Sequence, residues 1–264
     1  MITVLNKFLY FLYHQITNHT FLNLKGQNLR KKKLVIMLIT IFVTGSSVGV
    51  LGFIFLPSIL DSIGPIPQFV NNDWIDLEYV ASISKFHSTI GHGYPGDDNP
   101  TSDKHYFDPS IAYGSTNDTI KVYSPVRTRV TKIEWEHHVL SDGTIRGQQI
   151  HLQSIEHPSI TFIYFHINIE PTGLSLGQEL TPGQWIGYCD CREGCNTDIA
   201  IYRFNTVISW FQLITNALFS NYQARGISNR SMMIKSEAEI AYSFSMGYNF
   251  SNSDPSDWVG LSVI

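Results

Sequence analysis

The stretch TFIYFHINIEPTGLSLGQELTPGQWIGYCDCREGCNTDIAI, residues 161–201, decides the fold. It contains apolar runs of strand length, separated by turns that carry glycine and proline. Glycines such as Gly177 and Gly183 supply the positive φ angles or close backbone approach that tight turns require. We therefore expect short antiparallel strands here, one carrying His166 near its end and a later one carrying Asp198.

The same pattern extends outward on both sides. Alternation of apolar and polar residues predicts further strands, at residues 74–84, 119–135 (two strands broken at Ser124-Pro125), 147–153, 159–169, 180–188 and 198–204. Residues 86–108 are rich in Gly, His, Asp and Pro and are expected to form a loop. The composition of the predicted elements indicates an all-β domain.

A change of pattern follows this domain. Residues 208–219 space their apolar side chains as a helix does, and Ser236 is a suitable N-cap for a second short helix. We expect a small C-terminal helical appendage that packs on the β domain, with a lid over a groove as the alternative role.

A membrane anchor is predicted near the N-terminus. Residues 34–57 carry no charge and exceed the roughly 20 residues needed to cross a bilayer. The basic residues 30–33 precede this run directly, so the positive-inside rule places the N-terminus in the cytoplasm and the remainder outside. A cleaved signal peptide is the alternative. The sequence thus predicts a single-pass cell-membrane protein with an extracytoplasmic C-terminal domain.

These patterns divide the chain into five segments. They are a cytoplasmic N-terminal segment, a transmembrane helix, a linker, a β domain and the appendage, at residues 1–33, 34–57, 58–73, 74–207 and 208–264. The net charge is −4, with both signs dispersed and no basic patch beyond residues 30–33. We therefore expect no nucleic-acid partner.

Several ordered motifs resemble one known family. A strand reading IYFHIN is followed by the turns of GLSLGQELTPGQWIG, and then by a loop and the strand NTDIAIYR. This order resembles the lysostaphin-type zinc metallopeptidases over about residues 85–204. The resemblance implies a duplicated-hybrid-motif fold, which is an antiparallel β-sandwich or open barrel, and it marks this chain as a divergent member.

The resemblance also implies a zinc site. A catalytic zinc takes three protein ligands and keeps an open position for water. The GHGY stretch places His92 at the first ligand position of the family. In SDKHYFDP, His105 aligns with the second position, and Asp108 is its rival. Asp198 takes the third position, where the family has the last His of H-x-H.

One catalytic role is assigned to His166, two residues after Tyr164, where the family keeps an assisting histidine. Asn196 stands at the family's other assisting histidine, and an amide does not titrate. His137 or His138 could substitute, but an exposed pair in a hairpin tip is the favoured interpretation. The expected function is hydrolysis of cell-envelope peptide bonds, with peptidoglycan-like material as the substrate class. The alternative is a catalytically inactive module that binds or scaffolds envelope components.

The chain has three cysteines, Cys189, Cys191 and Cys195, spaced as C-x-C-x3-C. Outside the cytoplasm we expect one disulfide and one remaining thiol. A second metal site is the alternative, although no fourth ligand lies nearby in the sequence.

Overall fold

The computed structural model describes residues 61–62, 64–92, 100–136 and 138–263. Contacts divide the chain into two units, Met1–Gly64 and Pro65–Ile264. The predicted membrane helix at residues 34–57 lies outside the described residues. Within the described ranges, no helix combines the length and apolarity that a membrane crossing needs.

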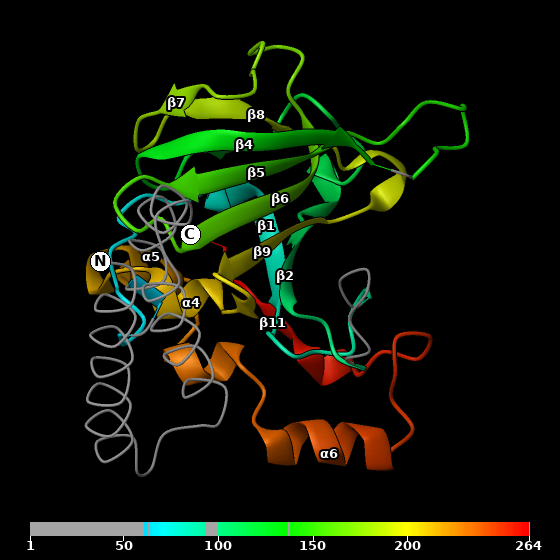
Figure 1. The fold of residues 1–264 in the computed structure, drawn as a ribbon. Coiled ribbons are helices and arrows are strands. Elements are labelled where there is room, and N and C mark those ends of the chain that lie inside the picture. The colour runs from blue at the N-terminus through cyan, green and yellow to red at the C-terminus, as the bar shows by residue number, and fades with distance from the viewer. Residues whose placement is uncertain (1–60, 63, 93–99, 137, 264) are drawn as a thin grey trace, which may run out of the picture. The chain divides into compact units, whose positions relative to one another are not determined.

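The second unit is mostly antiparallel β-sheet with few helices (Figure 1). Its strands are β1 Val80–Ser84, β2 Lys104–Pro109, β3 Lys121–Tyr123, β4 Thr128–Trp135, β5 Gln148–Ser154, β6 Ile160–Asn168, β7 Glu179–Leu180, β8 Trp185–Cys189, β9 Thr197–Arg203, β10 Thr206–Val207 and β11 Trp258–Gly260. The main order is β11-β1-β2-β9-β6-β5-β4-β7, while β10 pairs with β9 and β8 joins β3 to β6. All the paired strands are antiparallel.

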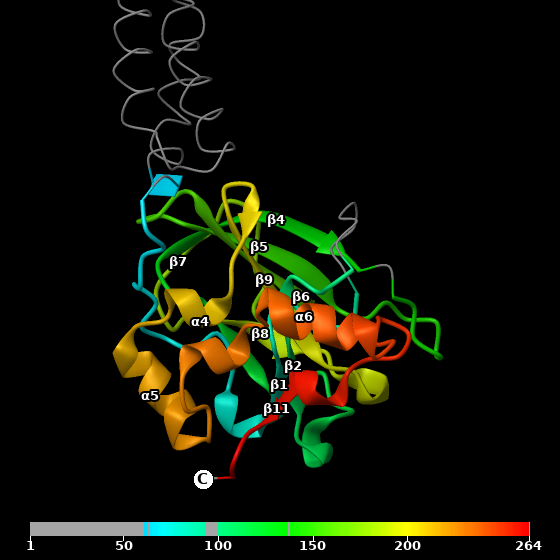
Figure 2. The same cartoon turned by 90° about the horizontal axis from the view of Figure 1, so that it is seen from below.

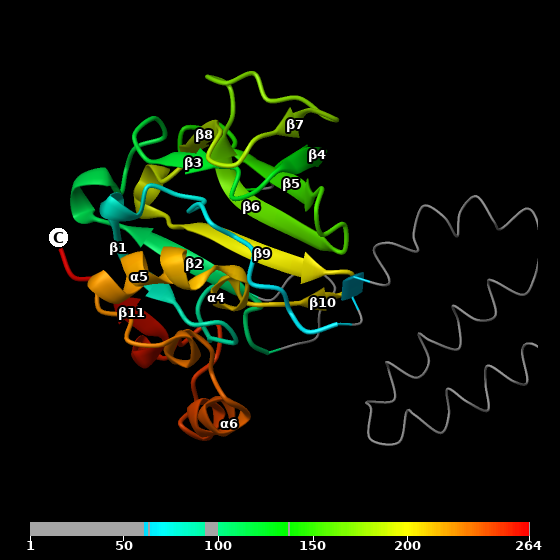
Figure 3. The ribbon, with the colours of Figure 1, turned by 90° about the vertical axis from the view of Figure 1, so that its left-hand side faces the viewer.

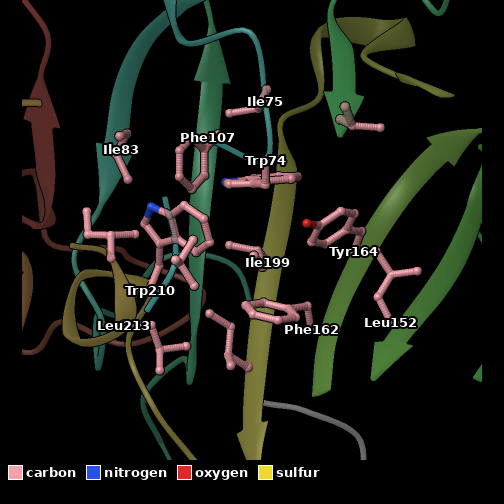
Figure 4. Packing of buried hydrophobic residues seen from close by; sticks show 14 of the residues in the cluster. Trp74, Ile75, Ile83, Phe107, Leu152, Phe162, Tyr164, Ile199, Trp210 and Leu213 are labelled. Carbon is pink, nitrogen blue, oxygen red and sulfur yellow. The ribbon is translucent and has the colours of Figure 1, made fainter. Parts of the chain in front are cut away.

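One apolar core fills the inner face of this sheet. Trp74, which is fully buried, packs edge-on against Phe107 with the ring centroids 4.9 Å apart and lies 4.8 Å from the ring of Tyr164 (Figure 4). Ile199 of β9 and Trp210 belong to the same cluster. Burial of large side chains such as these is the main favourable contribution to folding.

Among the described residues of the second unit, the α-helices follow β10. They are α4 Trp210–Leu213, α5 Asn216–Ala224 and α6 Glu237–Ser245. Short 3-10 turns occur at η1 Leu77–Tyr79, η2 Ile111–Tyr113, η3 Arg192–Gly194, η4 Arg230–Met233 and η5 Pro255–Asp257. Figures 2 and 3 show α4 and α5 close to the segment that enters the sheet, with α6 set apart from them. The side chains of α4 and α5 join the core, whereas α6 buries only Ser243.

A buried polar cluster holds the region around α6 in place. The ammonium group of Lys235 lies 2.5 Å from Asp257 Oδ1 and donates a hydrogen bond to the Ser243 hydroxyl at 2.7 Å. Asp257 Oδ2 accepts hydrogen bonds from the backbone and side chain of Thr89. The cluster therefore ties the C-terminal segment to the loop that follows β1.

The structure confirms most of the predicted strands and the helix capped by Ser236, which forms a capping box with Glu239. Two predictions are wrong. The helix expected over residues 208–219 is broken because Ile214 is extended and bridges to Val70. The loop expected over residues 86–108 contains β2, a strand that lies inside the sheet.

Candidate functional site

The register of β2 against β9 decides which side chains meet. Tyr106 lies opposite Asp198, and His105 lies opposite Ile199. Directly opposite residues in an antiparallel pair point to the same face, and successive residues alternate between faces. Lys104, Tyr106 and Asp198 therefore share one face, which we call the site face. His105 belongs to the other face, which lines the core.

His105 is fully occupied on the core face. Its Nδ1 lies 2.8 Å from the Ser84 carbonyl oxygen, and its Nε2 lies 2.7 Å from the Ser209 hydroxyl. The ring also meets Phe211 edge-on. Burial lowers the pKa of His105 to about 4, although the bond to the Ser84 carbonyl favours the protonated ring. Neither ring nitrogen is available to a metal in this arrangement.

A buried ion pair occupies the site face. Lys104 Nζ lies 2.7 Å from Asp198 Oδ2, and both side chains are only 1% exposed. The same ammonium group stands over the ring of Phe165, 3.6 Å from its centroid. Burial opposes ionisation of Asp198, but the positive charge of Lys104 and the contact with His166 hold the pKa of this carboxyl well below its usual range.

His166 reaches the ion pair from β6. Its Nε2 lies 3.3 Å from Asp198 Oδ1, and its Nδ1 lies 3.9 Å from Glu136 Oε1. The backbone φ angle of His166 is +62°, a value that residues other than glycine rarely adopt. The pairing of β5 with β6 shifts register here, because Gln148 is opposite Ile167 while Ile150 is opposite Tyr164. This bulge turns the imidazole toward Asp198.

Gly147 makes this backbone conformation of His166 possible. A Cβ atom on Gly147 would come within 2.7 Å of the carbonyl carbon of His166, and Gly147 itself has a φ of +57°. The site face also retains unused hydrogen-bonding capacity. Among the described residues, His166 Nδ1 and Asp198 Oδ1 are buried and make no hydrogen bond of good geometry.

The predicted first ligand, His92, approaches the site face through its backbone. Its N–H donates to the Tyr106 hydroxyl at 3.2 Å. The adjacent Gly91 packs so closely on the Tyr106 ring that a Cβ would collide with it. His92 itself is exposed. The loop thus covers Tyr106, which in turn is the direct neighbour of Asp198 on β9.

The ligand set His92, His105 and Asp198 is not assembled by the structure. Within the described ranges there is no group of three His, Cys, Asp or Glu side chains arranged to hold a metal. His105 faces the core, and Lys104 places a positive charge against Asp198. The residues present therefore do not fit the zinc ion that the resemblance implies. Asp108, the rival to His105, lies opposite Ser82 of β1.

Sequence reasoning missed Lys104, Tyr106 and Phe165. The alternation in SDKHYFDP could have identified them. Phe107 is strongly apolar, so it marks the residues of this strand that point to the core. His105, two residues before Phe107, points to the same face, and Lys104 points to the opposite face. Treating the segment as a loop removed this constraint.

The remaining candidates take structural positions. The backbone carbonyl of Asn196 accepts a hydrogen bond from Arg146. His138 is exposed, and His137 lies outside the described residues. The expected disulfide is not formed: Cys189, Cys191 and Cys195 are all free. Cys189 and Cys191 are buried in the core, where burial raises the pKa of the Cys189 thiol well above its usual range.

This chain is similar to several proteins of known structure. No known protein family matches this sequence, and no curated protein is similar enough to count as a relative. Csd3 of Helicobacter pylori is 15% identical with a TM-score of 0.38, and the match covers 57% of this chain and 34% of Csd3. The chain thus spans about a third of that protein's length.

Two further similar structures are peptidases. The catalytic domain of the antimicrobial peptidase lysostaphin from Staphylococcus simulans is 14% identical with a TM-score of 0.33, covering 51% of this chain and 85% of that domain. A zinc-containing peptidase from Vibrio cholerae is 18% identical with a TM-score of 0.37, covering 54% and 39%. The structures similar to this chain therefore include peptidases, one of them zinc-containing, but at TM-scores below 0.5 they assign it no activity.

Proposed function

We propose that this chain is a catalytically inactive module that binds or scaffolds components of the cell envelope. The observation that carries the proposal is the ion pair of Lys104 with Asp198, buried on the site face. A carboxylate serves as a metal ligand through a free oxygen, and an ammonium group 2.7 Å away competes for that oxygen with a full positive charge. Lys104 thus supplies internally the cation that Asp198 would otherwise bind.

The surroundings stabilise this arrangement. The ring face of Phe165 stabilises a cation at the Lys104 position. A metal ion that bound Asp198 would have to lose its own water and break the buried pair of the ammonium group with the carboxylate. The second predicted ligand is also committed, because both nitrogens of His105 are hydrogen-bonded on the opposite face. A hydrolase would have to break both arrangements before it could hold zinc.

The envelope location is supported by sequence features alone. The charged residues 30–33 and the uncharged residues 34–57 support a single membrane anchor with the domain outside the cytoplasm. A reporter fused after Ile264 tests this part separately. Activity of a reporter that works only in the cytoplasm would contradict the proposed orientation.

The functional test uses the full chain purified in detergent and incubated with excess zinc. We expect less than about a tenth of an equivalent of tightly bound zinc, no release of soluble fragments from peptidoglycan, and co-sedimentation of the protein with insoluble peptidoglycan. The first two quantities are measured by elemental analysis and by chromatography of the supernatant.

Two variants make the result interpretable. Asp198→Asn removes the charged partner on the site face, and Asp142→Asn changes an exposed hairpin carboxylate. Stoichiometric zinc together with hydrolysis that Asp198→Asn abolishes and Asp142→Asn leaves intact would establish the hydrolase instead. Absence of both hydrolysis and co-sedimentation would also overturn the binding proposal.

A further inference from the structure

We infer that a cleft at the end of β4, β5 and β6 binds a neutral saccharide, an inference that rests on the proposed binding function. The cleft has a volume of about 360 Å³, which lies in the range of small ligand pockets. Its lining includes Trp135 at the end of β4, Gln148 at the start of β5 and Asn168 at the end of β6.

The wall of the cleft is apolar and unusually exposed. Trp135 is 57% exposed and Ile145 is 39% exposed, although both are large apolar side chains. An indole face offers a broad, rigid platform at little cost in conformational entropy. The C–H face of a pyranose ring is apolar and flat enough to stack on such a platform. Burial of this surface by a ligand removes both side chains from water.

The floor of the cleft supplies polar groups for hydroxyls. Gln148 is only 6% exposed, and its Oε1 accepts a long hydrogen bond of 3.5 Å from the Ile169 N–H. The Gln148 side-chain amide, which also carries two N–H donors, belongs to the lining of the cleft. A hydroxyl oxygen of a bound ligand can accept a hydrogen bond from such an amide. Asn117 adds a further amide to the same lining, whereas the amide of Asn168 already donates through Nδ2 to the Asn117 carbonyl and accepts through Oδ1 from the Glu170 N–H.

The charges of the cleft select against an anionic ligand. Arg192 is neutralised by Asp190 through contacts of 2.8 Å at Nε and 2.6 Å at Nη2. Glu170 adds a carboxylate at the rim. A phosphate or nucleotide would meet this negative charge without a free cation. Neutral hydroxyl and acetamido groups match the amides of the floor instead.

A peptide fits less well than a saccharide. Peptides that bind sheets usually pair with the backbone of an unpaired edge. The floor offers no such edge, because Gln148 is opposite Trp135 on one side and opposite Ile167 on the other. Recognition therefore falls to side chains, and these combine one aromatic platform with several planar amides.

The cleft is distinct from the site face. Gly147 lines the cleft while its backbone packs on His166, and the N–H of Asp190, another lining residue, donates to the His166 carbonyl at 2.7 Å. The backbone of His166 thus separates the cleft from the ion pair of Lys104 with Asp198. Ligand binding in the cleft requires no change in that pair.

The experiment measures binding of soluble tri-N-acetylchitotriose to the full chain in detergent by saturation-transfer NMR and by titration of tryptophan fluorescence. We expect saturation of the sugar ring protons, and we expect Trp135→Ala to weaken binding about tenfold or more. Tyr242→Ala is the matched control, because Tyr242 on α6 is 63% exposed and lies outside the cleft.

The outcomes separate this inference from the proposed function. Loss of chitotriose binding in Trp135→Ala but not in Tyr242→Ala supports the cleft. No chitotriose binding by the wild-type chain, or equal binding by Trp135→Ala, overturns it. If insoluble peptidoglycan still co-sediments with the protein and a soluble stem peptide competes, the binding function stands and its site lies elsewhere. Metal-dependent hydrolysis would instead overturn the proposed function itself.

Discussion

The two faces of the β2–β9 pair treat buried polar side chains in opposite ways. On the core face, both ring nitrogens of His105 are hydrogen-bonded and the ring packs among aromatic residues. On the site face, His166 holds a strained backbone, and its Nδ1 and Asp198 Oδ1 keep unused capacity. A polar group that is fully satisfied serves the fold, whereas strain and unused capacity point to a role beyond stability.

The largest effect should come from removing the cation of the site face. Lys104→Met leaves the Asp198 carboxylate buried without its charged partner, which typically costs about 3–5 kcal/mol in the free energy of unfolding. The double variant Lys104→Met, Asp198→Leu should recover most of this loss. Urea unfolding of the three proteins measures both values. A loss below about 1 kcal/mol in the single variant would show that Asp198 does not depend on Lys104.

The contribution of His105 on the core face to the free energy of unfolding should depend on pH. The pKa of His105 is about 4 in the folded chain and 6.5 in its ordinary range, so the unfolded chain binds more protons between these values. The resulting stability is fully present above about pH 6.5 and is lost as the pH falls toward 4. A pKa lowered to this extent corresponds to a few kcal/mol in the free energy of unfolding.

Comparison with His105→Asn isolates this contribution, because the titrations of other groups cancel between the two proteins. We expect the free energy of unfolding of the wild-type chain to fall more steeply between pH 7 and pH 4 than that of the variant. Parallel curves would mean that His105 binds protons equally in the folded and unfolded chains, so that burial does not lower its pKa, and the contrast between the two faces would then be lost.

A smaller difference is expected between two glycine variants, one at the support of His166 and one away from it. Gly147→Ala places a methyl group against the His166 backbone and also imposes a positive φ on alanine. Gly143→Ala imposes the same kind of φ, +81°, with nothing within 4 Å of the new atom. The Gly143 variant should lose about 1 kcal/mol, and the Gly147 variant should lose about 2 kcal/mol more. Equal melting temperatures would show that the close approach is not a constraint.

The smallest effect is expected for His166→Asn. Asparagine tolerates positive φ better than most residues, and its amide keeps an N–H donor that can replace part of the contact of His166 with Asp198. We expect a change within about 0.5 kcal/mol, whereas His105→Asn should cost clearly more because it breaks two buried hydrogen bonds. Both losses are measured by urea unfolding at pH 7. Similar losses for the two substitutions would mean that His105 and His166 contribute equally to stability, and the distinction between the two faces would be lost.

The sequence predicted the sheet better than the site. Alternation and turn residues located the strands that carry Val130, Ile150 and Ile199, because half-buried strands repeat every two residues. The prediction of the site failed at β2, where polar residues on both faces of the strand conceal the alternation. A shift of one residue moves a side chain to the other face of a sheet, so choosing His105 rather than Lys104 changed the chemistry completely.

Interactions between distant segments also lay beyond the sequence. The contact of Lys104 with Asp198 joins residues 94 positions apart and depends on the β2–β9 register. The turn of His166 toward Asp198 depends on a bulge and on Gly147, and neither feature leaves a periodic signal. Motif spacing could place Asp198 and His166 on neighbouring strands, but it could not show that a lysine would stand between them and a metal.

The ends of the long sheet have a consequence for aggregation. At one end the three residues of β11 cover β1, and at the other the two residues of β7 cover part of β4. Very short terminal strands give a neighbouring molecule little backbone to pair with, and this limits cross-β growth. Removal of residues 258–263 would uncover the backbone of β1. The shortened protein should then form oligomers detectable by light scattering, even if its monomers retain the fold.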